Sequence, residues 1–175
     1  MRGLFPDPPT LKGTNVELKH LSLSDVEGLQ KLTQQEAVYR YLPTFLFEKK
    51  YATREVILRL YNEGLEDSLI LGIFHENRFC GLAEAYGYRS PIHKVSVGYR
   101  LLQEEWGKGI ATETLGIMIG ELLGNRGIEI ITASTMVENQ ASAHVLQKNE
   151  FSLVNHAVYE DWGFDEPILA DKWIR

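Results

Sequence analysis

A turn with two glycines constrains this chain more than any other feature of its sequence. It spans residues 104–112, with the order Glu-Glu-Trp-Gly-Lys-Gly-Ile-Ala-Thr, and joins a segment of alternating apolar and polar residues to an apolar helical one. Gly107 and Gly109 allow a tight backbone turn because neither carries a Cβ atom. The first N–H groups of the following helix lack intrahelical partners and carry a partial positive charge. The stretch therefore predicts a site for an anionic group such as a pyrophosphate.

Two other phosphate-binding signatures do not match this turn. A Walker loop needs Ser or Thr after its lysine, whereas Lys108 is followed by Gly109 and no glycine stands five residues before Gly107. A dinucleotide-binding turn needs a small residue where Thr112 stands, together with a strand–helix–strand unit at the N-terminus. The simpler alternative at this point is a glycine-rich loop that only begins a helix.

Hydrophobic periodicity predicts strands and helices in an order typical of an α+β chain. Ser24 and Glu27 form a candidate capping box for a first helix, and Thr53 is a candidate N-cap for a second helix that ends at Gly64. A long helix is expected at 110–123 and a short one after Asn139. Strands are expected at 16–21, 69–74, 79–86, 95–102, 128–134, 152–161 and 166–174.

A second motif carries a family resemblance together with the glycine turn. Residues 139–151 read Asn-Gln-Ala-Ser-Ala-His-Val-Leu-Gln-Lys-Asn-Glu-Phe, and the two stretches resemble the GCN5-related N-acetyltransferases (GNAT), most closely the RimJ/RimL-like subgroup that acetylates ribosomal-protein N-termini. Glu150 departs from the pattern, since glycine is usual there. The resemblance covers nearly the whole chain. It implies an α+β (mixed α/β) fold. This fold has a central, strongly bent mixed sheet of about seven strands, with about four helices on its two faces.

The resemblance implies transfer of an acetyl group from acetyl-CoA, as co-substrate, to a primary amine by direct attack in a ternary complex. The acceptor would be a protein N-terminus or a small amine. Two alternatives stay open: a non-catalytic or regulatory module that binds acyl-CoA, and an enzyme that prefers a longer acyl chain.

Cofactor-binding residues follow from the two motifs that carry the resemblance. Lys108 is either a phosphate partner or a solvated charge, and a backbone N–H near Leu101 or Leu102 is the expected donor to the thioester oxygen. The full expected set is Leu101, Leu102, Gly107, Lys108, Gly109, Ile110, Ala111, Thr112, Asn139, Ser142 and Lys148.

Catalytic residues are harder to assign, because two family positions have changed. Leu146 stands where many relatives carry a tyrosine acid, so Ser142, one turn earlier, is the candidate acid. Ser96 stands where relatives often carry a strand glutamate, so Glu84 on the neighbouring strand is the candidate base. Each also has a purely structural alternative, Ser142 as a small packing residue and Glu84 as a hydrogen-bonded carboxylate. His93 and Glu104 are lesser candidates for the base.

Aromatic residues gather between 39 and 51 and supply the expected acceptor pocket. The candidates are Tyr39, Tyr41, Phe45 and, from a strand, Tyr86. The competing interpretation places the cluster in the core beneath a helix–helix connection, where most such clusters are found.

Composition limits the remaining classes. The length of 175 residues predicts a single domain over 1–175 with an irregular lead-in at 1–12. A formal net charge of -6 argues against a nucleic-acid partner. Cys80 is the single cysteine and the five histidines lack metal-ligand spacing, so no metal is expected. No apolar run reaches the ~18 residues of a membrane span, so a cytoplasmic protein is expected. The oligomeric state stays open between a monomer and a homodimer.

Overall fold

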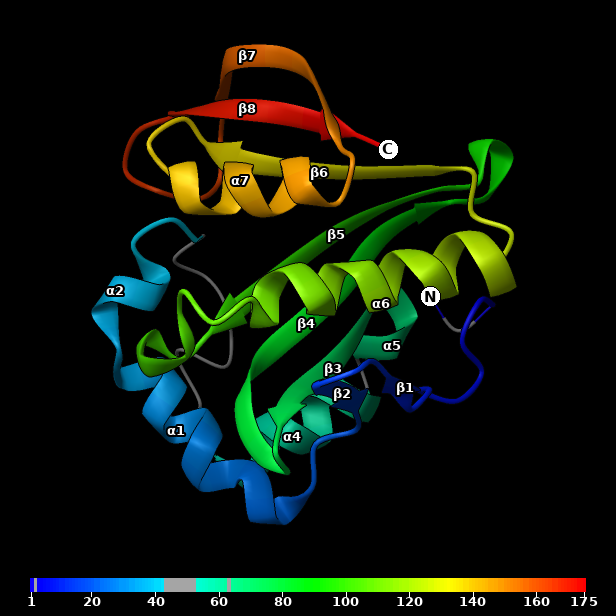
Figure 1. The fold of residues 1–175 in the computed structure, drawn as a ribbon, viewed down its shortest axis with the longest axis vertical. Helices are drawn as coiled ribbons and strands as arrows, with labels where there is room; N and C mark the ends of the chain where they lie inside the picture. Colours follow the sequence, from blue (N-terminus) through cyan, green and yellow to red (C-terminus); the bar gives the residue numbers. More distant parts are fainter. Residues whose placement is uncertain (2, 43–52, 63) are drawn as a thin grey trace.

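One eight-stranded sheet organises the chain, in the order β1-β2-β3-β4-β5-β6-β8-β7 (Figure 1). The computed structural model describes residues 1, 3–42, 53–62 and 64–175. The strands are β1 (Leu11–Lys12), β2 (Val16–Lys19), β3 (Ser68–His75), β4 (Arg78–Arg89), β5 (Lys94–Leu101), β6 (Ile130–Met136), β7 (Ser152–Glu160) and β8 (Ile168–Ile174). β5 and β6 are parallel, whereas the other neighbouring strands are antiparallel.

The parallel pair exists because a helix connects its two strands. Between two parallel strands the chain must return to the end of the sheet where the first strand began, which takes a dozen or more residues. α6 (Ile110–Asn125) supplies this crossover, and its first turn follows the glycine turn directly. The predicted strand–helix–strand unit is therefore present, with the turn beyond the carboxyl end of β5.

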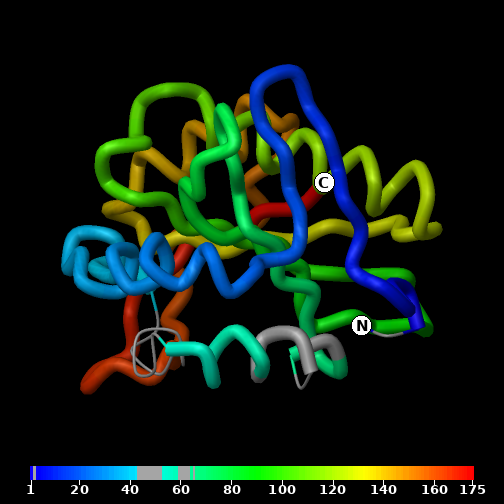
Figure 2. Tube along the Cα trace, turned by 90° about the horizontal axis from the view of Figure 1, so that it is seen from below, coloured from blue at the N-terminus to red at the C-terminus, as the bar shows by residue number. Residues whose placement is uncertain are grey.

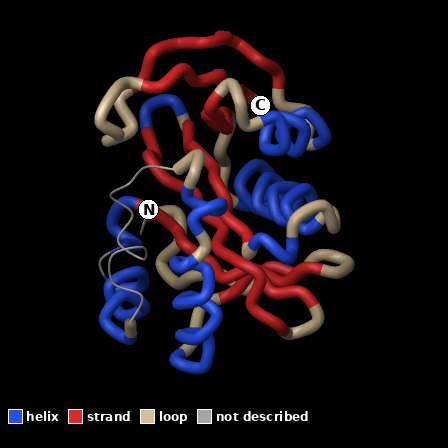
Figure 3. The backbone as a smooth tube through the Cα atoms, turned by 90° about the vertical axis from the view of Figure 1, so that its left-hand side faces the viewer, coloured by secondary structure: helices blue, strands red, loops and turns tan. Residues whose placement is uncertain are grey.

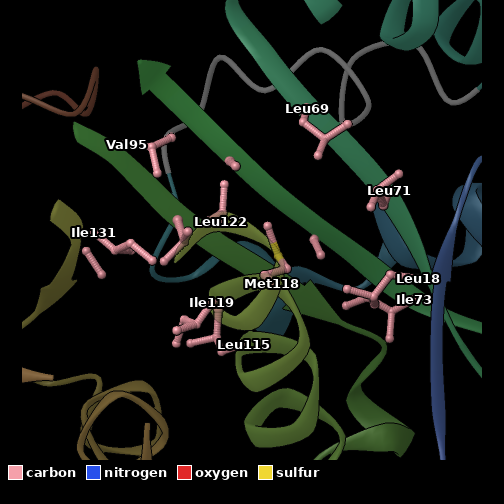
Figure 4. Packing of buried hydrophobic residues seen from close by; sticks show 14 of the residues in the cluster. Leu18, Leu69, Leu71, Ile73, Val95, Leu115, Met118, Ile119, Leu122 and Ile131 are labelled. Carbon is pink, nitrogen blue, oxygen red and sulfur yellow. The ribbon is translucent and has the colours of Figure 1, made fainter. Parts of the chain in front are cut away.

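Side-chain alternation along the strands divides the core into two clusters. In β3, Leu69, Leu71 and Ile73 belong to one cluster, and Ile70 and Phe74 belong to the other. Figure 4 shows the first cluster, where side chains of α6 point toward the strands. Each fully buried aliphatic side chain stabilises the fold by about 1.5–3 kcal/mol.

Helices cover both faces of the sheet (Figure 3). α6 and α7 (Gln140–Lys148) pack with the first cluster, and α1 (Val26–Gln34), α2 (Glu36–Tyr39) and α4 (Arg54–Asn62) pack with the second. Figure 2 shows α4, in teal, on the opposite side of the molecule from α6, in yellow-green. α5 (Gly64–Asp67) and the short 3-10 turns η1 (Leu23–Asp25), η2 (Ser90–Ile92) and η3 (Gln103–Glu105) complete the described elements. Among the helices so described, none combines the length and apolar character needed to cross a bilayer.

Two local predictions need correction. The capping box lies two residues earlier than expected: the Ser22 backbone N–H donates to the Asp25 carboxylate at 2.6 Å, and η1 precedes α1. The 1–12 lead-in is also less irregular than predicted, because Leu11 and Lys12 pair with β2 and Phe5 is fully buried. The pairing of β1 with β2 therefore adds an eighth strand to the seven that the sequence predicts. The first difference is local, since a serine followed three residues later by an acidic residue fits Ser22 and Asp25 as well as Ser24 and Glu27. The second comes from tertiary contacts that local residue preferences do not contain.

Candidate functional site

The site is built where β5 and β6 separate. Their parallel pairing runs from Lys94 with Ile130 to Ser96 with Thr132 and then stops, although both strands continue. The Ser96 and Thr132 hydroxyls hydrogen-bond at 2.9 Å at the last pair. Beyond it, β5 keeps β4 on one side and has an open edge on the other, as Figure 1 shows.

A cavity of about 1060 Å³ occupies this opening and reaches both faces of the sheet. On the α6 side its lining includes the glycine turn, the start of α6 and the inner face of α7. On the α2 side it includes Glu84, Tyr86 and Tyr41, and from the C-terminal strands Glu160 and Lys172. The cavity thus connects two half-sites. The half-site on the α6 side is lined by the glycine turn and the start of α6, and the half-site on the α2 side is lined by carboxylates and tyrosines.

The glycine turn has the expected backbone geometry. Gly107 and Gly109 have φ angles of 74° and 81°, in the left-handed region that side chains rarely adopt. A Cβ atom built on either glycine would meet no described atom within 4 Å, so the space in front of the turn is open. Gly109 is the N-cap of α6 and offers no side-chain cap, which leaves the first N–H groups of the helix directed at the cavity.

Lys108 is paired within the turn. Its ammonium lies 3.0 Å from the carboxylate of Glu105, whose side chain is only 7% exposed. The Trp106 indole N–H donates to the Leu101 carbonyl at 3.0 Å and fixes the turn to the end of β5. Lys108 thus has a partner on the protein and, unlike Gly107 and Gly109, does not line the cavity.

Strand geometry separates the two expected N–H donors of β5. The Leu102 N–H donates to the Cys80 carbonyl at 2.8 Å, toward β4. Because successive N–H groups of a strand point to opposite sides, those of Leu101 and Tyr99 point to the open edge. Leu102 is therefore removed as a donor, and Tyr99 joins Leu101.

α7 brings a serine and a tyrosine together. Asn139 caps the helix by accepting from the Ser142 N–H at 3.2 Å, and it lines the cavity with Ser142 and Lys148. The Ser142 hydroxyl lies 3.2 Å from the Tyr99 phenol oxygen of β5. Burial raises the pKa of Tyr99, with Ser142 opposing this shift through its hydrogen bond. Leu146, at the usual tyrosine position, is buried in the core.

Sequence reasoning missed Tyr99. In the sequence it shares one face of the 95–102 strand with Val95, Val97 and Leu101. The available signal was a phenol within an otherwise aliphatic face. Only the packing of α7 against that face identifies its hydroxyl partner.

The α2 side of the opening carries carboxylates held by cations. Glu84 forms an ion pair with Arg100 at 3.5 Å, and the Arg100 side chain is 4% exposed. Glu160, at the end of β7, forms an ion pair with Lys172 and accepts from the Trp162 indole N–H at 2.9 Å. In the sequence, Glu160 begins an acidic stretch that could attract a cationic substrate or simply be solvated.

Tyr86 lines the cavity together with these two carboxylates. Its pKa is raised to about 12, first by burial of the phenol and then by the charges of Glu84 and Glu160. Tyr41 lines the same cavity. Tyr39 does not, because it is 4% exposed and packs in the second core cluster. Phe45 lies outside the described residues.

Neither lesser candidate for the base lies in the cavity lining. His93 is exposed in the link between η2 and β5. Glu104 is held by Lys31 and Gln35 on the outer surface of the turn. Within the described ranges, no cluster of three His, Cys, Asp or Glu side chains could hold a metal ion.

Comparison with known proteins decides the family. Residues 15–152 match the model of the acetyltransferase (GNAT) domain, which is most of the chain. The chain belongs to the GNAT family. Its members are acetyl-CoA-dependent N-acetyltransferases, so the family supplies the reaction class for the cavity of this GNAT domain.

Solved structures share the fold at low sequence identity. A RimL ribosomal L7/L12 α-N-protein acetyltransferase in complex with coenzyme A is 18% identical, with a TM-score of 0.81 over 95% of this chain and 97% of that one. A GNAT-family acetyltransferase from Bacillus anthracis is 17% identical, with a TM-score of 0.82 over 95% and 98%. The microcin C7 self-immunity acetyltransferase MccE, in complex with acetyl-CoA and AMP, is 17% identical, with a TM-score of 0.79 over 93% and 93%. No curated protein matches the sequence.

Proposed function

We propose that this GNAT domain transfers the acetyl group of acetyl-CoA to a primary amine by direct attack in a ternary complex. The amine belongs to a protein N-terminus or to a small molecule. The observation that carries the proposal is the opening between β5 and β6, because one cavity joins an anion cradle to a half-site lined by carboxylates. A donor and an acceptor can therefore meet from opposite faces of the sheet.

The cradle suits a pyrophosphate. The open space at Gly107 and Gly109, and the first N–H groups of α6 at Ile110, Ala111 and Thr112, match a group with many acceptor oxygens. The open edge of β5 can pair with the pantetheine amides as a further strand would. Asn139 and Lys148 of α7 border the same path. Bound acetyl-CoA would supply the acyl group as a thioester.

Backbone donors would stabilise the charge that develops on the carbonyl oxygen. The N–H groups of Leu101 and Tyr99 point to the open edge of β5 and are fixed by the sheet. Preorganised donors of this kind contribute about 2.7–4 kcal/mol each to transition-state stabilisation. Because they belong to one rigid strand, little reorganisation is needed.

Two proton transfers complete the reaction. The amine nitrogen forms a bond to the carbonyl carbon while the carbon–sulfur bond breaks. The amine gives its proton to Glu84 or Glu160, directly or through water. The thiolate that leaves takes a proton from Ser142, and the serine oxygen regains a proton from solvent, directly or through the hydrogen-bonded Tyr99 hydroxyl.

A calorimetric titration with acetyl-CoA tests the cofactor. The parent protein is expected to bind in the micromolar range, and Gly109→Glu is expected to weaken binding to about millimolar, a loss of about 4 kcal/mol. Gly120→Glu is the matched control, since it adds the same charge at an exposed position of α6. Equal binding by the two variants would contradict the cradle assignment.

An acceptor panel tests catalysis. Release of coenzyme A in proportion to acetylated amine supports the enzyme. Tight binding with slow hydrolysis and no acetylated amine would instead indicate a regulatory acyl-CoA-binding module. Competition between acetyl-CoA and longer acyl-CoA species tests the acyl preference.

A further inference from the structure

Lys94 occupies a position in the cavity that the reaction described above does not use. It is the first residue of β5, it is half-buried, and it lines the cavity. Its side chain lies on the same face as Ser96 and Gly98, because alternate residues of a strand share a face. This is the face that also carries Glu84 and Tyr86, so Lys94 belongs to the acceptor half-site.

Lys94 is too far from the glycine turn to serve the pyrophosphate. The turn follows the opposite end of β5, and Leu101 is the seventh residue after Lys94 along the strand. At a rise of ~3.3 Å per residue this corresponds to about 23 Å. A lysine side chain reaches only about 6 Å, so the acetyl donor does not explain this charge.

The charges around Lys94 are unfavourable to it. Arg89 of β4 is its cross-strand partner, and Lys172 of β8 lines the same cavity. Burial lowers the pKa of Lys94, and the charges of Arg89 and Lys172 lower it further. An anion placed beside the ammonium group would reverse these costs.

The other cations of this half-site already have partners. Lys172 is paired with Glu160 and donates to the Ser134 hydroxyl at 3.1 Å, and Arg100 is paired with Glu84. By contrast, in the part of the chain that the structure describes, no carboxylate lies within ion-pair distance of Lys94. Glu84 and Glu160 are thus committed to other cations, and Asp161, which also lines the cavity, accepts from the Gly163 N–H at 2.9 Å, while the Lys94 charge is left for a ligand.

Two hydroxyl groups extend this position toward the reacting centre. Ser96, two residues along β5, and Thr132, its partner on β6, lie on the acceptor face and line the cavity. They hydrogen-bond to each other and retain further capacity to donate or accept. A charged group with several oxygens can use Lys94 and these hydroxyls together.

We infer that Lys94 binds an anionic group of the acceptor, so that the substrate is an amine that also carries a carboxylate or a phosphate. This inference rests on the proposed acetyl transfer. The amine would react near Gly98, four residues along β5 from Lys94, so the anionic group lies within about 13 Å of the amine. A short acidic peptide or an aminoalkyl phosphate meets this requirement.

Matched acceptors test the inference with the full-length protein. The pairs are β-alanine and β-alaninamide, 3-aminopropyl phosphate and 3-aminopropanol, and an N-terminal peptide amide with glutamate or glutamine at its third position. The preference is the ratio of kcat/KM within each pair. Comparing this ratio between proteins cancels differences in amine basicity.

Lys94→Met is expected to lower the preference for the anionic member about tenfold or more, because one charge-assisted contact is lost. Lys94→Arg is expected to keep most of it. Lys12→Met is the control, because it removes the same charge from a lysine whose side chain is 75% exposed and outside the cavity lining. Melting temperatures establish that the variants fold. The pair that shows the effect identifies the source of the anion, a peptide side chain, a small carboxylate or a phosphate.

Two results would overturn the inference and can be distinguished. Equal use of anionic and neutral amines, or an unchanged ratio in Lys94→Met, removes the anion site and leaves the acetyltransferase proposal standing. Acetyl-CoA binding without acetylation of any member removes both.

Discussion

The phenol of Tyr99 and the hydroxyl of Ser142 lie 3.2 Å apart, which connects β5 to α7 across the cleft. One residue comes from the strand whose N–H groups point to the open edge, and the other comes from the helix that borders it. The Ser142 hydroxyl, as proton donor, and the N–H groups of β5, as donors to the carbonyl oxygen, are therefore held in a fixed arrangement by β5 and α7. This arrangement supplies a hydroxyl pair where Leu146 replaces the tyrosine of many relatives.

Ser142→Ala should lower kcat by about 10²–10⁴-fold if the serine protonates the thiolate, with little change in acetyl-CoA affinity. Tyr99→Phe should lower kcat by about tenfold, and the double variant should resemble Ser142→Ala because the two groups act together. Steady-state kinetics measure all three. Tyr159→Phe, at a position 74% exposed on β7, is the control and should match the parent. Strict additivity of the two losses would argue that the groups act independently.

Glu84→Gln and Glu160→Gln distinguish the two candidate bases. The base should show a fall in kcat of at least about 10²-fold, because no group then accepts the amine proton, whereas the other variant should change kcat much less. Urea unfolding controls for stability, since each glutamine also weakens an ion pair, with Arg100 or with Lys172. A small change in kcat in both variants would contradict a carboxylate base.

Gly81 and Gly98 lie on two neighbouring strands, β4 and β5. Substitution by alanine should nevertheless affect stability very differently at the two positions. A Cβ atom on Gly81 would lie 2.1 Å from the Arg100 carbonyl oxygen and 2.8 Å from the Leu101 Cα, so backbone would have to move. We expect Gly81→Ala to lower the free energy of unfolding by about 1–3 kcal/mol. A Cβ atom on Gly98 meets only the Tyr86 ring at 3.8 Å. Gly98→Ala should therefore keep stability, within about 0.5 kcal/mol, and raise KM for the amine. Urea unfolding and kinetics measure both; equal stability losses would refute the contrast.

Gly107→Ala should destabilise the protein by about 1–2 kcal/mol, because its φ of 74° lies in the left-handed region. It should also weaken acetyl-CoA binding by placing a methyl group in the cradle. Gly120→Ala, at an exposed position in the middle of α6, should instead stabilise the protein by up to about 1 kcal/mol. Urea unfolding compares the two, and a loss in Gly120→Ala would show that the helix itself needs glycine.

Glu104 should give a small acid-dependent contribution to stability. Hydrogen bonds from Lys31 and then Gln35 lower its pKa to about 2. A carboxyl group whose pKa is lower in the folded state stabilises above its unfolded pKa and loses this contribution as pH falls through the folded value. The stability difference between the parent and Glu104→Gln should therefore be constant above about pH 5 and shrink toward pH 2. It should stay below about 1 kcal/mol, since the pair is exposed. A difference that grows on acidification would contradict the assignment.

Sequence alone determined the parts of this protein that depend on local geometry. These parts are the turn with two glycines, the apolar helix after it and the strands of alternating residues. None of them requires a distant contact, because backbone freedom, helix ends and side-chain periodicity are properties of neighbouring residues. The positive φ angles at Gly107 and Gly109 and the crossover through α6 follow from them. The family also followed, since both of its motifs are continuous in sequence.

Tertiary structure decided which side chains share a space. Tyr39 entered the core while Tyr41 lined the cavity, although the two are only two residues apart and equally aromatic. Glu160 and Tyr99 joined the site because β7 and β5 bring them there, 43 residues separating Tyr99 from its partner Ser142. The Leu102 N–H was lost as a donor because Cys80 accepts it from the next strand. Burial, pairing register and the separation of β5 from β6 depend on contacts between distant segments, and local residue preferences carry no record of those contacts.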